Sequence, residues 1–308
     1  MHTLLKPESM ETDLLHTCNL CDSNLLDSID SDSNIVQCRS CGYVFDNPRP
    51  TLGELITFYS KKEKYDSWLK ELGPRNRLWK RRLKKLQSTR KPGSLLDVGA
   101  GIGQFLFTAR TSYREVYGTE VSASAVAIAK QKYGLDLFHG SVEELAQQGK
   151  RFSNITLFHV LEHVPDPRAM LKTCHSLLED GGCLVIAVPN EITSLRGFKK
   201  RLFGKIKKES SQGLLGLPRL TLDGSIAEIH LSHFTPSVLR RLVEATGFSV
   251  MVNTLDPYYV ATGFARVKAD ILYYGCLAVH QIFRVNIYDA ILMIARKEAP
   301  SQPSLKAS

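Results

Sequence analysis

The sequence lacks any long apolar run. Its first ten residues contain no hydrophobic stretch of the kind that a signal peptide needs. The longest apolar stretch, Ile271 to Phe283, falls short of the roughly 20 residues that a helix needs to cross a bilayer. These two absences lead us to expect a cytoplasmic protein without a membrane-spanning helix.

Acidic residues are in the minority. Asp and Glu number 31 against 40 Lys and Arg, which gives a net charge of +9 at pH 7. The surplus of basic residues is concentrated in two segments, Arg75 to Lys91 and Arg196 to Lys208. Such segments bind phosphate, nucleic acid or an anionic membrane, and many are simply solvated helix faces.

The chain is long enough to bury a full core. Its 308 residues are 43% hydrophobic and 23% charged, a balance typical of folded proteins. From Ser94 onward, strand-like and helix-like segments alternate, which predicts a doubly wound α/β sheet. The strands expected are residues 94–98, 115–119, 136–139, 155–159, 183–188, 248–253 and 289–296.

The first of these strands runs into a glycine-rich turn at residues 99–103 and then into a helix. Glycine lets the backbone turn sharply and approach a ligand that a Cβ atom would push away, while the N–H groups that open the helix face that ligand. The same pattern serves dinucleotides, and a tight turn without a ligand is an alternative.

The second strand ends at Glu120, about 20 residues beyond the glycine turn, where a carboxylate accepts hydrogen bonds from the ribose hydroxyls of a nucleoside. The alternative role is a solvated acid that caps a helix. After the fourth strand, Leu161-Glu162-His163-Val164 reaches the carboxyl edge of the sheet, where open α/β folds bind their ligands.

The glycine turn, Glu120 and the segment Phe158 to Pro167 together resemble class I S-adenosylmethionine-dependent methyltransferases, in the branch that carries Leu-Glu-His-Val after strand four. The resemblance covers residues 93–298 and implies a Rossmann-like sheet of seven strands, the last antiparallel. It also implies S-adenosylmethionine as cofactor. The cofactor-binding residues that it implies are Asp97, Gly99, Ala100, Gly101, Gly103, Glu120, Ser141, Val142 and His159.

Two positions depart from the family pattern. An acid usually stands where this chain has Ser141, although a hydroxyl still accepts one hydrogen bond and the N–H of Val142 offers another for adenine. Ubiquinone-pathway O-methyltransferases carry a glutamate that can join a divalent ion where this chain has His159. The resemblance therefore does not imply a metal ion at that segment.

Cysteines are few, but four of the seven form two Cys-x-x-Cys pairs near the N-terminus, at Cys18, Cys21, Cys38 and Cys41. This is the spacing of a zinc ribbon, in which four thiolates close a tetrahedral site and leave no position open for catalysis. We expect one structural Zn²⁺. Two disulfides are the alternative and would need an oxidising compartment. The other cysteines are expected in the core.

The expected domains are a zinc ribbon at residues 14–50, a helical linker at 51–92 and the methyltransferase domain at 93–298. A run of the type Cys-Gly, Asn-Pro-Arg-Pro, helix and Tyr resembles ribbon-bearing methyltransferases and extends the resemblance to about residue 18. In the linker, the helix 75–86 places Trp79, Leu83 and Leu86 on its apolar face and Arg82 elsewhere. A cap insertion is expected at 191–232 and a disordered tail at 299–308.

Methyl transfer from a sulfonium is an in-line displacement, so an oxygen or nitrogen nucleophile needs alignment and a base. The candidates for this base are His163, His230 and His233, because the pKa of histidine lies near working pH. A purely structural hydrogen bond is the alternative for His163. An activated carbon nucleophile would need no strong base.

The acceptor is expected to be a small molecule, a sugar or a lipid-linked glycan. The basic insertion and the apolar segment Ala265 to Phe283 predict an approach to an anionic membrane surface, with the protein peripheral there. RNA methylation is the first alternative, opposed by the absence of an Asn/Asp-Pro-Pro-aromatic segment after strand four. The second is a non-catalytic binding module whose cofactor domain is a relic. The sequence sets no oligomeric state.

Overall fold

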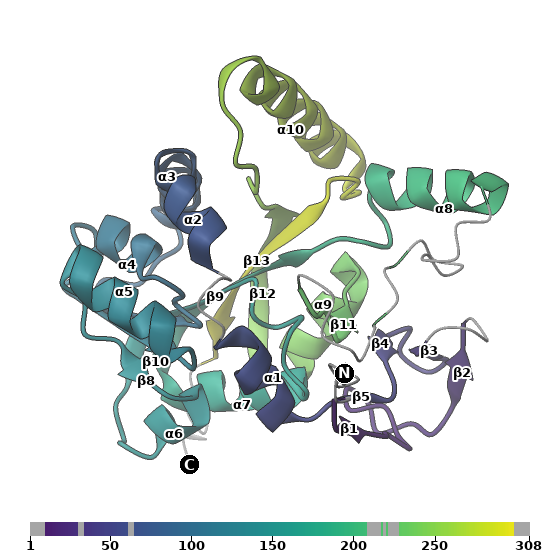
Figure 1. Cartoon of the computed structure of the whole chain (residues 1–308), viewed down its shortest axis with the longest axis horizontal. Coiled ribbons are helices and arrows are strands. Elements are labelled where there is room, and N and C mark those ends of the chain that lie inside the picture. Colours follow the sequence, from purple (N-terminus) through teal and green to yellow (C-terminus); the bar gives the residue numbers. More distant parts are fainter. Residues whose placement is uncertain are drawn as a thin grey trace, which may run out of the picture.

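The computed structural model describes residues 10–29, 34–60, 65–207, 217, 220 and 228–298. The tail expected from residue 299 and most of the apolar part of the expected cap lie outside these residues. Within them the chain forms one large sheet, two small sheets and the helices that surround them (Figure 1).

The large sheet has seven strands in the order β12-β13-β10-β9-β6-β7-β8. The parallel part, β10-β9-β6-β7-β8, is built by crossovers, and β13 pairs antiparallel with both β10 and β12. This confirms the sheet that the sequence predicts. Its strands are β6 (Ser94–Val98), β7 (Glu115–Glu120), β8 (Phe138–His139), β9 (Phe152–Phe158), β10 (Leu178–Pro189), β12 (Phe248–Leu255) and β13 (Ala290–Lys297).

Alternate residues of the central strands face opposite layers. One face of the sheet packs against α6 (Val142–Ala146), α7 (Pro167–Leu177) and α9 (Pro236–Ala245). The other packs against α3 (Leu72–Leu86) and α4 (Gln104–Ala109). The remaining helices are α1 (Leu52–Tyr59), α2 (Asp66–Lys70), α5 (Ala123–Tyr133), α8 (Leu195–Lys207) and α10 (Gly263–Phe283).

The cysteine-bearing region forms a four-stranded sheet whose fourth strand comes from the far side of the insertion. Its order is β11-β4-β3-β2, from β2 (Leu26–Ser28), β3 (Ile35–Cys38), β4 (Val44–Asp46) and β11 (Ser232–His233). A further pair joins β1 (Thr12–Asp13) to β5 (Arg49–Pro50). We call β2, β3, β4 and the two cysteine turns the ribbon.

The ribbon shares a hydrophobic core with the large sheet. Tyr43 and Phe45 are fully buried together with Phe234 and residues of α9. The Tyr43 hydroxyl lies 2.5 Å from Ser232 Oγ, and Asn19 Nδ2 donates to the Pro165 carbonyl at 2.9 Å. Ribbon and sheet domain are therefore packed as one body.

The helix α3 confirms one expectation and corrects another. Trp79, Leu83 and Leu86 are buried against the sheet, as predicted. Arg82 was expected off this face, but it is 0% exposed and donates to both carboxylate oxygens of Asp256. A buried guanidinium is stable only when it is paired, and no local sequence pattern indicates that Asp256, 174 residues away, is the partner.

Two helices stand away from this body. Figure 1 shows α10 projecting at the top and α8 beside it. Only Tyr273 and Cys276 of α10 are buried, so most of this helix is in contact with solvent. No helix in the described part of the chain has the length and apolar character needed to span a bilayer.

Candidate active site

A cavity of about 1260 Å³ opens at the carboxyl ends of the parallel strands. Its walls come from the turn after β6, the end of β7, the segment after β9 and the linker helices α1 and α3. This is the edge at which open α/β sheets bind ligands. The cavity is far larger than a single water site and is suited to a nucleoside together with a second molecule.

The glycine turn is shaped for close approach. Gly99 and Gly101 adopt φ values of 66° and 54°, which disfavour any side chain. A Cβ atom on Gly99 would lie 2.6 Å from Val160, and one on Gly101 would lie 2.8 Å from Trp68. Packing against Val160 and Trp68 therefore requires glycine at both positions, and both glycines line the cavity.

Glu120 closes the floor beside this turn. Its Oε2 accepts the Gly101 N–H at 2.7 Å and its Oε1 accepts the Ser122 N–H at 2.9 Å. Burial raises the pKa of Glu120, while these N–H groups oppose the rise. Each carboxylate oxygen keeps a second lone pair, so Glu120 can accept two further hydrogen bonds from a ligand.

Only some of the residues that the family resemblance implies for cofactor binding line the cavity. Asp97, Ala100 and Gly103 do not line the cavity. Asp97 is buried beneath it, accepts the Thr156 hydroxyl at 2.6 Å, and has its pKa raised to about 7 by burial. Ser141 lines the cavity, but its hydroxyl already accepts the Glu144 N–H and caps α6. Those that line the cavity are Gly99, Gly101, Glu120, Ser141, Val142 and His159.

Two arginines on α3 also line the cavity, and the sequence analysis missed them. Arg75 is 8% exposed and stacks on Trp68 at 4.3 Å. Its Nε lies 3.6 Å from Glu71 and has no hydrogen-bond partner among the described residues. The spacing of Arg75, Trp79 and Arg82 places all three on one helix face. This periodicity could have predicted that the two arginines share the buried face with Trp79.

His159 bridges two buried carboxylates at the start of the segment after β9. Its Nδ1 lies 3.2 Å from Glu162 Oε1 and its Nε2 lies 3.7 Å from Asp256 Oδ2. Its ring packs on Tyr258 with 4.3 Å between centroids. Burial opposes a charge on His159, but the two carboxylates prevail and raise its pKa.

His163 has a defined tautomer. Its Nδ1 lies 2.6 Å from the Ile229 carbonyl and 2.8 Å from the Tyr59 hydroxyl. A carbonyl oxygen only accepts hydrogen bonds, so Nδ1 carries the proton and the neutral ring keeps a lone pair on Nε2. The Nε2 atom lies 3.8 Å from Glu162 Oε1. Burial lowers the pKa of His163, the Glu162 carboxylate opposes this, and the positive charge of His230 lowers the pKa further, so that the net shift is downward.

His230 has the opposite electrostatic setting. Its Nδ1 lies 3.2 Å from Glu191 Oε1 and its Nε2 lies 3.6 Å from Glu228 Oε2. Burial disfavours the charge, but these carboxylates raise the pKa of His230 to about 10. Its ring lies 5.0 Å from that of His163. Near neutral pH the cavity therefore holds a neutral histidine beside a protonated one.

The third candidate, His233, does not line the cavity and is 2% exposed. Its Nδ1 lies 2.7 Å from Glu191 Oε2 and its Nε2 lies 3.1 Å from Asp46 Oδ2. Burial opposes its protonation, yet hydrogen bonds to Asp46 and Glu191 raise its pKa to about 9. His233 thus stands behind Glu191 and joins it to the ribbon.

One donor set in the cavity also has the dimensions of a metal site. Ligand atoms of Glu162, His163 and His230 lie within 4.8 Å of one another. Glu162 Oε2 is buried and has no hydrogen-bond partner in the described part of the chain. Imidazole and carboxylate suit a divalent cation as well as proton transfer.

The profile of the methyltransferase-domain family matches residues 69–252, which is more than half of the chain. This chain belongs to that methyltransferase family. The enzyme is 33% identical over 168 residues to a ubiquinone biosynthesis O-methyltransferase of Coxiella burnetii (strain RSA 331), a match that covers 52% of this chain and 69% of the relative. A relative of the same name in Aromatoleum aromaticum is 31% identical over 161 residues, covering 50% and 62%.

A solved structure supports the fold of the methyltransferase. A chain in the complex of the Haloferax volcanii Trm112 methyltransferase activator with its methyltransferase partner superposes with a TM-score of 0.50 at 12% identity. The match covers 80% of this chain and 98% of that one. S-adenosylmethionine, on which the enzyme depends, supplies a methyl group on a positively charged sulfur. The glycine turn and the acceptor oxygens of Glu120, which line the cavity, fit its nucleoside.

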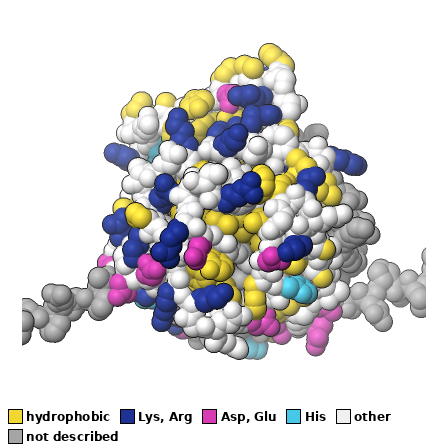
Figure 2. All heavy atoms as spheres, turned by 90° about the vertical axis from the view of Figure 1, so that its left-hand side faces the viewer, with side chains coloured by type: hydrophobic (Ala, Val, Ile, Leu, Met, Phe, Trp, Pro, Cys, Tyr) yellow, Lys and Arg dark blue, Asp and Glu magenta, His cyan; other side chains and the backbone are white. Residues whose placement is uncertain are grey.

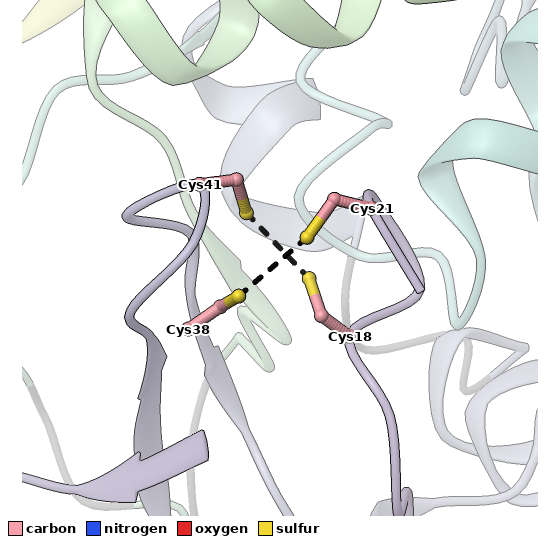
Figure 3. Close-up of side chains that lie close together, drawn as sticks. All are labelled: Cys18, Cys21, Cys38 and Cys41. Carbon is pink, nitrogen blue, oxygen red and sulfur yellow. Dashed lines mark hydrogen bonds between the residues drawn. The ribbon is translucent and has the colours of Figure 1, made fainter. Parts of the chain in front are cut away.

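The four ribbon cysteines converge on one point (Figure 3). The Sγ atoms of Cys18 and Cys41 are 3.6 Å apart, as are those of Cys21 and Cys38. Zn–S bonds of about 2.3 Å at tetrahedral angles require S–S separations of roughly 3.8 Å, whereas a disulfide requires about 2.05 Å. The geometry matches a four-thiolate metal site, and neither of these two sulfur pairs lies at disulfide distance in this structure. Cys174, Cys183 and Cys276 are buried, as expected.

Proposed function

We propose that the enzyme methylates a hydroxyl group on a small acceptor, and that His163 removes the proton. The observation that carries this proposal is the geometry of two cavity histidines whose rings lie 5.0 Å apart: His163 Nδ1 faces the Ile229 carbonyl, and His230 lies between the carboxylates of Glu191 and Glu228. This geometry favours a neutral His163 and a protonated His230. A base must be unprotonated to accept a proton, and a nearby cation stabilises the oxyanion that forms. The oxyanion then attacks the methyl carbon in line with the departing sulfur.

The names of the relatives support oxygen as the nucleophile. The matching proteins of Coxiella burnetii and Aromatoleum aromaticum are called O-methyltransferases of ubiquinone biosynthesis. Sugar and lipid-linked acceptors carry hydroxyls as well and belong to the same chemical class. Of the alternatives, RNA methylation and a non-catalytic binding module would leave the small-molecule fraction unlabelled when methyl-labelled cofactor is incubated with cell extract.

We propose that Glu120 holds the ribose hydroxyls and that Arg75 holds the carboxylate of the cofactor's methionine part. Arg75 supports this assignment because its buried guanidinium lines the cavity, and its Nε, paired with Glu71 only at 3.6 Å, has no hydrogen-bond partner among the described residues. The carboxylate is the one anionic group of S-adenosylmethionine. The N–H of Val142 and the backbone of Gly99 and Gly101 complete the proposed nucleoside site, with Ser141 reserved for capping α6.

We also propose one structural Zn²⁺ at Cys18, Cys21, Cys38 and Cys41. Two sulfur pairs at 3.6 Å support a closed tetrahedral set. The ion would hold the two cysteine turns together and leave no ligand position for a reactant.

The cofactor assignment predicts different effects for two substitutions. Glu120→Ala should weaken binding of both S-adenosylmethionine and methylthioadenosine by about ten- to hundredfold, since both carry the ribose. Arg75→Ala should weaken S-adenosylmethionine by about tenfold and leave methylthioadenosine unchanged, because the latter has no carboxylate. Calorimetry measures both, with Glu115→Ala at the exposed start of β7 as the control. Equal losses of both ligands in Arg75→Ala would contradict its assignment.

The zinc assignment predicts one zinc ion per chain in protein purified under reducing conditions. Cys38→Ser should lose the ion and lower the midpoint of a single thermal transition, because the ribbon and the large sheet share one core. Cys276→Ser, outside the cluster, should retain the ion. Zinc-free wild-type protein, measured by elemental analysis, would refute the site.

The base assignment predicts that His163→Gln lowers kcat by about 10²- to 10⁴-fold with little change in cofactor affinity. In the wild type, kcat/KM should be constant near neutral pH and fall as pH drops below 6.5, because protonation of His163 occurs below the ordinary pKa of 6.5. His16→Gln, at an exposed position, is the control. If His163→Gln had a normal kcat and kcat/KM still fell below pH 6.5 as in the wild type, His163 would not be the base.

A further inference from the structure

A second, smaller cavity of about 390 Å³ lies between α3 and α10. It is lined by Arg77, Lys80, Arg81, Tyr259, Arg266, Asp270 and Tyr274, which we call the basic groove. Four cations thus face one carboxylate. Within the described residues, no ion pair or hydrogen bond neutralises Lys80, which is exposed.

Internal contacts fix the shape of the groove without cancelling its charge. Arg81 donates to the Tyr259 carbonyl at 2.7 Å and lies 3.7 Å from the centre of the Tyr259 ring. Arg77 donates to the Ala261 carbonyl at 3.2 Å. Carbonyl oxygens orient these guanidinium groups but leave their positive charge. Asp270 is shared between Arg266, at 3.5 Å, and the Tyr259 hydroxyl.

An exposed apolar stripe runs along α10 beside the groove. Phe264, Val267, Ile271 and Tyr274 are 73%, 50%, 69% and 60% exposed. Their spacing of three, four and three residues places them on one side of the helix. Figure 2 views the side of the molecule on which α3 lies in Figure 1, and shows hydrophobic side chains at the top with Lys and Arg side chains below them.

We propose that this surface docks the enzyme on an anionic lipid bilayer, with lipid phosphates in the basic groove and the apolar stripe of α10 inserted among the acyl chains. Cations beside exposed apolar side chains combine charge attraction with shallow insertion. A second copy of the chain is a poorer occupant, because a two-fold contact across α10 would bring one basic groove toward the other. The proposal goes beyond the methylation chemistry and is tested without turnover.

The groove also lies against the wall of the active site. Arg82 and Tyr258 line the large cavity, whereas their chain neighbours Arg81 and Tyr259 line the groove. A bilayer bound at the groove would therefore lie next to the segments that carry Arg82 and Tyr258 of the active-site wall. The exposed Leu195, Phe198 and Leu202 of α8 form a second apolar stripe. The side chains of Lys205 and Lys207 on that helix lie outside the described residues, so the proposal rests on α3 and α10.

Flotation with two kinds of vesicle tests the proposal: phosphatidylcholine alone, and equal parts phosphatidylcholine and phosphatidylglycerol. The full-length protein should float with the anionic vesicles and not with the neutral ones, and added salt should release it. Replacing Arg77, Lys80 and Arg266 by glutamine should weaken this binding by about a hundredfold, since each cation contributes about fivefold near an anionic surface. Phe264→Ser with Ile271→Ser should weaken it as well.

The matched control replaces Lys132, Lys172 and Arg240 by glutamine, which removes the same charge from other exposed helices. The proposal expects normal vesicle binding for this control and an unchanged thermal midpoint for both triple variants. The proposal is overturned if the wild-type protein does not bind anionic vesicles, even if calorimetry shows that it binds inorganic phosphate or a gel shift shows that it binds RNA. Equal loss in the control and groove variants also overturns it, because net charge alone would then account for binding.

Discussion

The arrangement of the active site depends on the ion pairs that the Glu191 carboxylate makes with His230 and His233. One of its oxygens lies 3.2 Å from His230 and the other 2.7 Å from His233. Burial would raise the pKa of Glu191, but the two imidazolium groups hold it far below its ordinary value. A buried carboxylate and its buried cations stabilise one another, and removing one partner leaves the others with an uncompensated charge.

This contact joins parts of the chain that are remote in sequence. Glu191 follows β10, while His230 and His233 return from the insertion, and His233 reaches Asp46 at the end of β4. The same segment supplies β11 to the ribbon sheet. The ribbon therefore holds in place the segment that follows the insertion, at His230 to His233. These contacts with the ribbon hold His230 in the cavity, and the charge of His230 lowers the pKa of His163.

Local sequence signals predicted much of the fold and part of the site. The strand pattern, the glycine turn and the cysteine spacing each act over a few residues, and the sheet order and the four-cysteine cluster agree with them. The failures were long-range. Arg82 was expected off the apolar face of its helix, because its partner Asp256 is distant in sequence. The difference between His163 and His230 depends on burial and on the carboxylates of Glu191 and Glu228, which come from separate segments.

The central claim is that the cavity pairs a neutral His163 with a protonated His230. Nitrogen-15 NMR of the imidazole side chains measures this directly at pH 8, with His163→Gln and His230→Gln used for assignment. The account predicts that His230 carries protons on both ring nitrogens, since its pKa is raised to about 10, and that His163 carries one on Nδ1 only. A neutral His230, or a His163 protonated on both nitrogens at that pH, would contradict it.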